Sequence, residues 1–156
     1  LASVLMVRRG FDKEDFARNH PGGELGKQLA LKVENIMHPI NDVAQINNKD
    51  SISSCAKKMT DNPLGAALLL ENGSLKGIVT EGDLRKSIAS NLDLSNSIEP
   101  FINDNPISIH SSVSILDAMK IMEDRSSKIS CLPVVDSDGK CLGLLTIHDL
   151  YQTKLV

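Results

Sequence analysis

One pattern occurs twice in this chain, and it limits the folds that the chain can adopt. Residues 77–86 read GIVTEGDLRK and residues 143–152 read GLLTIHDLYQ, so both copies have Gly, two aliphatic residues, Thr, two variable residues, Asp and Leu. Thr80 corresponds to Thr146 at an offset of 66 residues, and Met59 corresponds to Met122 at an offset of 63. Self-similarity at a nearly fixed period indicates two copies of one folding unit that pack together.

The first copy shows the patterns of strand, helix, strand, strand and helix, in that order. An amphipathic helix begins after Ser51, whose side chain can cap it, and runs through Met59. Asn72-Gly73 separates two apolar runs, as is typical of a tight β-hairpin. A last helix opens at Glu81. The strands are predicted over residues 43–46, 66–71 and 75–80.

The second copy repeats this order with a helix over residues 113–124. That helix has one apolar face, which belongs either to the core or to a surface for assembly, formed by Ile115, Ala118, Met119 and Met122. A turn at 137–139 and a helix that opens at Ile147 complete the copy. The strands are predicted over residues 107–110, 131–136 and 141–146.

The first 31 residues have a different character. Residues 1–9 resemble the last turns of a helix stopped by Gly10, and residues 12–18 a short second helix. Pro21-Gly22-Gly23 then predicts a turn or loop. Because the chain begins without Met inside a helical pattern, we expect it to belong to a longer protein, with a boundary near Leu31.

Composition excludes several classes of function. The net charge is −3 and aromatic residues make up 3% of the chain without a Trp, so a nucleic-acid interface is not expected. The four His residues are dispersed, and no metal site is predicted. The three Cys residues lie in apolar surroundings, which favours reduced thiols and a cytoplasmic location. No apolar run reaches the length of a membrane span.

The Thr-x-x-Asp element of each copy has two compatible interpretations. Thr80 with Asp83, and Thr146 with Asp149, have the spacing of a helix capping box, which by itself accounts for both residues. The same geometry suits a nucleotide, because a helix N-terminus attracts phosphate, a Thr hydroxyl can donate to it, and a carboxylate can accept from ribose hydroxyls. Gly77 and Gly143 would keep the approach of such a ligand unobstructed. No catalytic group accompanies either element.

The repeat and its closing G-x-φ-T-x-x-D-L resemble the cystathionine-β-synthase-type (CBS) domain, and two in tandem resemble a CBS pair, or Bateman module, over about residues 33–152. The resemblance implies an α/β (α+β) fold of tandem domains, each a small three-stranded mixed sheet with two helices, packed pseudo-symmetrically. It also implies nucleotide clefts between the repeats. Ligand contacts would then fall on Thr80 and Asp83 in one cleft, Thr146 and Asp149 in the other, with walls from Val43, Ala44, Ile107 and Ser108.

The leading segment is similar to the junction of KpsF/GutQ-type sugar-phosphate isomerases, which include arabinose 5-phosphate isomerases. There a SIS (sugar isomerase) domain is followed by R-G-F, H-P-G-G-x-L-G and D-I-M-H elements. This chain has Arg9-Gly10-Phe11, residues 20–26 as HPGGELG and residues 35–38 as NIMH. Glu24 and Asn35 depart from the Ser and Asp that are common in the family.

This second resemblance gives His20 a role in proton transfer in the parent isomerase, a task that suits a pKa near neutrality. The chain lacks the remainder of a SIS domain, so we expect it alone to have no isomerase activity. Arg85 is a further candidate ligand contact as a bidentate donor, and His148 another, although a surface or structural role is the simpler interpretation for both.

Taken together, these patterns predict a SIS tail and linker over 1–31, a first CBS repeat over 32–92 and a second over 93–156. The predicted function is nucleotide or nucleotide-sugar binding that regulates an arabinose 5-phosphate isomerase of Kdo and lipopolysaccharide biosynthesis. The expected ligand is CMP-Kdo or an adenine nucleotide, and no resident cofactor is expected. Expected partners are the chain's own SIS domain and further copies in a homo-oligomer, with no nucleic acid or membrane. The alternative is a pair without ligand that serves only assembly.

Overall fold

The computed structural model describes residues 23, 26 and 30–154, and the helices proposed for residues 1–18, together with His20, lie outside this part. The helices are α4 (Val33–Ile36), α5 (Ile52–Asp61), α6 (Glu81–Ala89), α7 (Ile115–Glu123) and α8 (Ile147–Gln152), with 3-10 turns η1 (Ile40–Asp42) and η2 (Glu99–Phe101). The strands are β1 (His38–Pro39), β2 (Ala44–Ile46), β3 (Ala66–Glu71), β4 (Ser74–Thr80), β5 (Ile109–His110), β6 (Cys131–Val135) and β7 (Cys141–Thr146).

The first repeat forms a three-stranded mixed sheet in the order β2-β3-β4, in which β2 is parallel to β3 and β3 is antiparallel to β4. Asn72 and Gly73 both have positive φ, 51° and 80°, which confirms the predicted tight hairpin. Ser51 caps α5 by accepting a hydrogen bond from the backbone N–H of Ser54 at 3.0 Å, also as predicted.

The second repeat has the same arrangement in β5-β6-β7, and its sheet gains a fourth strand, giving the order β1-β7-β6-β5. The extra strand β1 comes from the segment that leads into the first repeat, and it pairs antiparallel to β7 with His38 opposite Leu144 and Pro39 opposite Gly143. The sequence patterns did not predict β1, because two residues are too few to show a periodicity.

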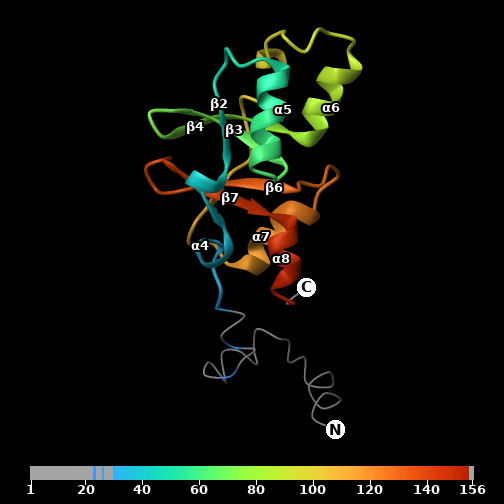
Figure 1. Ribbon diagram of the computed structural model, residues 1–156. Coiled ribbons are helices and arrows are strands. Elements are labelled where there is room, and N and C mark those ends of the chain that lie inside the picture. Colours follow the sequence, from blue (N-terminus) through green and yellow to red (C-terminus); the bar gives the residue numbers. More distant parts are fainter. Residues whose placement is uncertain (1–22, 24–25, 27–29, 155–156) are drawn as a thin grey trace.

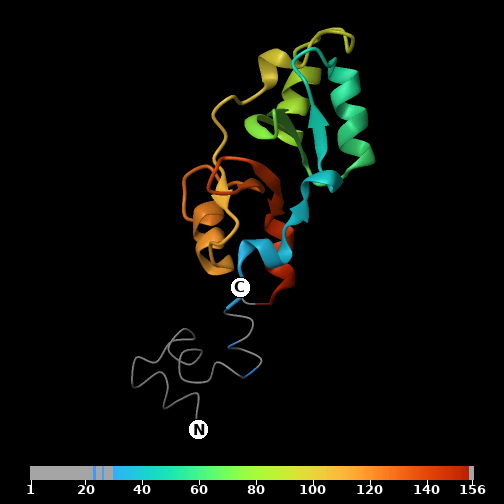
Figure 2. The same ribbon diagram turned by 90° about the vertical axis from the view of Figure 1, so that its left-hand side faces the viewer.

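The leading segments of the two repeats are exchanged. Val33 of α4 is buried in the core of the second repeat, and Figures 1 and 2 show α4 beside α7 and α8. Conversely, Ile98, just before η2, is buried in the core of the first repeat. Asn103 then forms a backbone bridge to Ile78 of β4, as His38 does to Leu144 of β7. The segment that precedes the first repeat in the sequence therefore completes the second repeat, and the segment that precedes the second completes the first.

The two sheets meet in a shared apolar cluster. Ala66, Leu68 and Ile78 of the first repeat pack there with Cys131 and Leu144 of the second, and Figure 1 shows β3 and β4 lying next to β6 and β7. The end of β4, at Thr80, and the corresponding end of β7, at Thr146, therefore lie on the side where the two repeats meet.

The apolar face of α7 belongs to the core. Ala118 and Met122 are fully buried, Ile115 is 2% exposed, and Met119 packs against the same cluster. This burial decides between the two interpretations of the face and leaves it unavailable for assembly.

In the described part of the chain no helix combines the length and apolar character needed to cross a bilayer. The three Cys residues are buried free thiols. Burial raises the pKa of the Cys55 thiol to about 11, so it stays protonated near neutrality.

Candidate functional site

The first Thr-x-x-Asp element forms a complete capping box where β4 passes into α6. Asp83 Oδ2 accepts from the hydroxyl of Thr80 at 2.6 Å and from its backbone N–H at 3.0 Å, while the backbone N–H of Asp83 donates to Thr80 Oγ1 at 3.4 Å. Among the residues that the structure describes, the other carboxylate oxygen, Oδ1, accepts only a long bond of 3.4 Å from Lys86, whose side chain is 77% exposed. The Asp83 carboxylate is therefore held through Oδ2, while Oδ1 can accept hydrogen bonds from solvent in place of Lys86.

Burial raises the pKa of Asp83, but the hydrogen bonds from the hydroxyl and backbone N–H of Thr80, and from Lys86, outweigh it and hold the pKa below the ordinary value. The carboxylate is thus ionised near neutral pH. An ionised carboxylate is acceptor-only, which suits it to bind a pair of hydroxyl groups.

The second element forms the same box where β7 passes into α8, with one added contact. Asp149 Oδ2 accepts from the hydroxyl of Thr146 at 2.7 Å and from its backbone N–H at 2.9 Å. Asp149 Oδ1 lies 3.0 Å from Nε2 of His38, the residue that β1 carries onto this sheet. Because a carboxylate only accepts, His38 Nε2 is the donor. Both oxygens of Asp149 are engaged by the protein.

Thr80 of the first element and both Thr146 and Asp149 of the second line one pocket of about 920 Å³ between the repeats, whereas Asp83 is not among its lining residues. Its lining includes polar and charged residues from both repeats and from both leading segments, among them His38, Thr80, Glu81, Arg85, Asn103, Arg125, Ser127, Lys128, Ser130, Thr146, His148, Asp149 and Gln152. The two clefts expected from the sequence thus form one continuous space in the structure. Thr80 and Thr146, which are 66 residues apart in the sequence, both line it.

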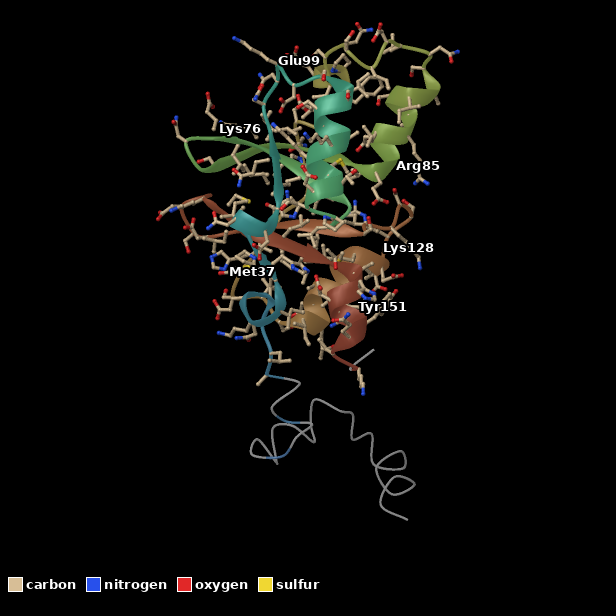
Figure 3. The ribbon with its side chains drawn as sticks, in the orientation of Figure 1. Met37, Lys76, Arg85, Glu99, Lys128 and Tyr151 are labelled. Carbon is tan, nitrogen blue, oxygen red and sulfur yellow. The ribbon has the colours of Figure 1, made fainter. Side chains whose placement is uncertain are left out.

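The charged rim of the pocket is mainly cationic. Arg85 comes from α6, whereas Arg125 and Lys128 come from the loop between α7 and β6. Figure 3 shows Arg85 and Lys128 on the same side of the molecule. Glu123 accepts hydrogen bonds from Lys128 and from the hydroxyl of Tyr151, which holds the Lys128 side chain near the pocket. Within the described residues neither Arg is in an ion pair, so both guanidinium groups are available to an anion.

Of the four predicted wall residues, one lines the pocket and three do not. Ile107 lines the pocket and is 41% exposed. Val43, Ala44 and Ser108 do not line it. Val43 and Ala44 are 3% and 1% exposed because their side chains pack into the apolar cores. Ser108 precedes β5 and is exposed. The predicted contact of these last three residues with a base therefore finds no support in their positions. The predicted Thr80, Arg85, Thr146, His148 and Asp149 line the pocket, and Asp83 does not.

Gly77 and Gly143 serve the fold, which corrects the expectation that they clear the approach of a ligand. A Cβ at Gly143 would lie 2.0 Å from the backbone oxygen of His38, and one at Gly77 would lie 2.5 Å from Cγ2 of Ile102. The missing side chains admit the exchanged leading segments. Those segments, in turn, bring His38 and Asn103 to the pocket.

Sequence reasoning missed His38, Asn103, Arg125 and Lys128 as pocket residues. The two basic residues stand in an expected loop between helix and strand, where a local excess of positive charge was a usable signal. His38 and Asn103 reach the pocket only through pairing with the other repeat, which no local pattern encodes. In the described part of the chain no cluster of three His, Cys, Asp or Glu residues could hold a metal ion.

Comparison with known proteins follows the same division of the chain. The model of a family described as "CBS domain" matches residues 33–90 and again residues 98–154. The arabinose 5-phosphate isomerase KdsD of Pseudomonas aeruginosa is 40% identical over 154 residues, which is 97% of this chain and 47% of that protein. The chain thus spans about half the length of the curated relatives it matches.

Solved structures agree on the fold. The CBS domain pair of protein MJ0100, in complex with 5′-methylthioadenosine and S-adenosyl-L-methionine, superposes with a TM-score of 0.69 at 24% identity, covering 79% of this chain and 94% of that one. The CBS domain protein PAE2072 from Pyrobaculum aerophilum, complexed with AMP, gives a TM-score of 0.65 at 22% identity over 76% and 89% of the two chains. At these identities the likeness establishes architecture alone.

Proposed function

The chain belongs to the CBS-domain family, and on that premise we propose that it is a regulatory module that binds a nucleotide or nucleotide sugar between its repeats. One observation carries the proposal: Thr80, Thr146 and Asp149 line a single pocket of about 920 Å³ together with three cationic side chains. That volume lies within the roughly 300–1,000 Å³ of small-molecule sites. The adenosine ligands of the structural neighbours MJ0100 and PAE2072 are consistent with this class of ligand.

The pocket contains carboxylate and cationic side chains, which suit different parts of a nucleotide. Asp149 lines the pocket and is the proposed acceptor for ribose hydroxyls, while Arg85, Arg125 and Lys128 provide donors for phosphate or for an acidic sugar. Thr146 differs from the sequence-based expectation, because its hydroxyl already donates to Asp149. Its role in this proposal is to orient the carboxylate, and phosphate contacts pass to the cationic rim.

We further propose that the chain regulates an arabinose 5-phosphate isomerase, because its similarity to the isomerase of Pseudomonas aeruginosa extends over nearly its whole length. The candidate signal is CMP-Kdo, the activated product of the pathway that consumes arabinose 5-phosphate. Its phosphate and sugar carboxylate match three cations better than a neutral nucleoside does. The assignment of His20 to proton transfer, and the absence of isomerase activity from this chain alone, stay predictions about the larger protein.

A thermal-shift titration tests the proposal. CMP-Kdo, CMP, AMP, ATP and arabinose 5-phosphate are added separately to the 156-residue chain. A nucleotide at 100 times its Kd stabilises the fold by about 2.7 kcal/mol, which raises the unfolding midpoint by several degrees. The shift should disappear in Asp149→Ala, which lines the pocket, and persist in a control, Lys76→Ala, at an exposed residue of β4 outside the pocket. If none of the five compounds moves the midpoint at millimolar concentration, the proposal is wrong.

The alternative function, assembly without a ligand, predicts a different pattern. Light scattering would then show a homo-oligomer whose mass is unchanged by any of the five compounds. The α7 face that the sequence offered for such an assembly is buried in the core, so another surface would have to form the contact.

A further inference from the structure

The loops that lead from the first long helix of each repeat to the next strand differ in length and in charge. Residues 62–65, between α5 and β3, form a loop of four residues, whereas residues 124–130, between α7 and β6, form a loop of seven. The short loop reads NPLG and is uncharged, while the long loop reads DRSSKIS and brings Arg125 and Lys128 to the pocket. The longer loop therefore supplies both cations that the second repeat contributes to the pocket.

The long loop is tied to α7 at both of its ends. The backbone N–H of Arg125 donates to the carbonyl oxygen of Glu123 at 2.8 Å, and that of Ile129 donates to the carbonyl oxygen of Met122 at 3.0 Å. The Ile129 side chain also packs against the core of the second repeat. The fold itself thus positions the backbone that carries the two cations.

The two cations of this loop differ in their partners. Lys128 donates to Glu123, which also accepts from the hydroxyl of Tyr151 at 2.9 Å. The Arg125 side chain is exposed and, among the residues that the structure describes, is in no ion pair. Lys128 is therefore already bound by a carboxylate of the protein, whereas the Arg125 guanidinium is available to a ligand.

Arg85 reaches the same pocket from the other repeat. The residues of α6 that line the pocket are Glu81, Gly82 and Arg85, which lie on one face of that helix. Figure 3 shows Arg85 of the first repeat and Lys128 of the second on the same side of the molecule, on either side of the level where the repeats meet. Since a guanidinium group presents a planar fork of donors, Arg85 and Arg125 can grip one phosphate or carboxylate from two walls.

Two carboxylates also line the pocket, and neither neutralises these Arg side chains. Asp149 accepts from Thr146 and from His38, and its side chain is 13% exposed. Glu81 Oε1 lies 4.0 Å from the position of a Cβ at Gly65, another residue of the pocket wall. Within the described part of the chain neither carboxylate is in an ion pair with an Arg. The pocket thus offers acceptors and guanidinium donors as separate groups, to hydroxyls and to anions respectively.

We propose that Arg125 and Arg85 hold one anionic group of the ligand between them, so that the bound anion links the two repeats. This inference rests on the proposed function, because it assigns the anion subsite of the same pocket. Arg125 thereby selects a nucleotide over the corresponding neutral nucleoside. Lys128, held by Glu123, shapes the loop and does not contact the anion.

Isothermal titration of the 156-residue chain tests the inference with matched charged and neutral compounds. AMP is compared with adenosine, and CMP and CMP-Kdo are compared with cytidine. Arg125→Gln should weaken binding of the charged compounds about tenfold, a change of about 1.4 kcal/mol, and leave the Kd of the nucleosides within about twofold. Arg85→Gln should have the same effect.

The double variant tests whether the two Arg residues share one anion. Independent contacts would multiply to a loss of about a hundredfold, because the effects of uncoupled sites add in free energy. Arg85→Gln combined with Arg125→Gln should instead weaken binding clearly less than this product, since either single change already breaks the two-sided grip.

Two Lys variants are controls for the loss of one positive charge. Lys120→Gln changes an exposed residue of α7 outside the pocket, and Lys128→Gln changes the neighbouring cation of the same loop. Each should alter the Kd of the charged compounds less than about twofold, because neither ammonium group contacts the anion.

The outcomes separate this inference from the proposed function. Equal losses in Arg125→Gln, Lys128→Gln and Lys120→Gln would indicate a general effect of charge and would overturn the shared grip. A hundredfold loss in the double variant, or equal binding of nucleotides and nucleosides by the wild type, would overturn it as well and leave ligand binding in the pocket intact. Absence of binding of every compound by the wild type would overturn the proposed function and the shared grip together.

Discussion

The two Thr-x-x-Asp elements share a capping box and differ in almost everything around it. The position two residues after Thr is Gly82 in the first repeat and His148 in the second, and the position five residues after is Arg85 in the first and Tyr151 in the second. Arg85 lines the pocket, whereas Tyr151 donates to Glu123 outside it. What the copies share serves folding, since a box starts each helix. What distinguishes them affects ligand access. Gly82 covers the first element less than His148 covers the second, and Arg85 makes the first element more cationic.

The largest expected effect tests whether the two exchanged segments are held equally tightly. Gly143→Ala should lower the free energy of unfolding by about 3 kcal/mol, because its Cβ would lie 2.0 Å from a backbone atom of β1 that must move. Gly77→Ala should cost about half as much, because its closest contact is the Ile102 side chain, which can change rotamer. Urea denaturation measures both.

Gly139→Ala is a matched control for the loss of a glycine without a close contact, since a Cβ there has no neighbour within 4 Å. Its positive φ of 79° gives it a cost of about 1 kcal/mol from backbone strain alone. Equal costs at Gly77 and Gly143 would mean that β1 is no better anchored than its counterpart, and the positioning of His38 would lose its basis.

The second prediction concerns ligand affinity. Asp149→Asn should raise the Kd of a bound nucleotide by at least about tenfold, because Asp149 lines the pocket and an amide there loses the charge-assisted bonds to ribose. Asp83→Asn should change the Kd less than about twofold, because Asp83 does not line the pocket. Titration calorimetry with AMP compares the two. Similar losses at both positions would show that the ligand uses the two elements alike.

The third prediction concerns the stability of the two Asp variants without ligand. Both alanine variants keep the Thr cap but lose the Asp acceptor for the Thr hydroxyl and backbone N–H, a loss of about 1 kcal/mol. Asp149→Ala also loses the bond from His38, so it should be more destabilising than Asp83→Ala by about another 1 kcal/mol. Urea denaturation of the two variants measures this difference. His38→Ala should remove most of the difference between them when combined with each.

The internal repeat was enough to predict every long element and the starts of α5, α6 and α8, whereas α7 begins at Ile115, two residues later than predicted. Ser51 and Thr80 each cap a helix as expected, because caps are local and depend on residues three positions apart. The sequence did not reveal which repeat each leading segment completes. His38 of β1 contacts Asp149, which is 111 positions further along the chain. Such a contact depends on the packing of the sheets and not on local periodicity. For the same reason, two clefts were expected where the packed sheets form one pocket.

The smallest expected effect concerns pH and the first box alone. Because the folded-state pKa of Asp83 is lowered, its ionised form stabilises the fold above the unfolded-state pKa, and that contribution is lost as the pH falls through the folded-state pKa. The stability of the wild type should therefore approach that of Asp83→Asn as the pH falls from 5 toward 3. The full change should not exceed the roughly 1 kcal/mol of a helix cap. Urea titrations of both proteins at several pH values measure the difference directly, so that the titration of all other groups cancels. A difference that stays constant over this range would show that the charge of Asp83 adds nothing to the capping box.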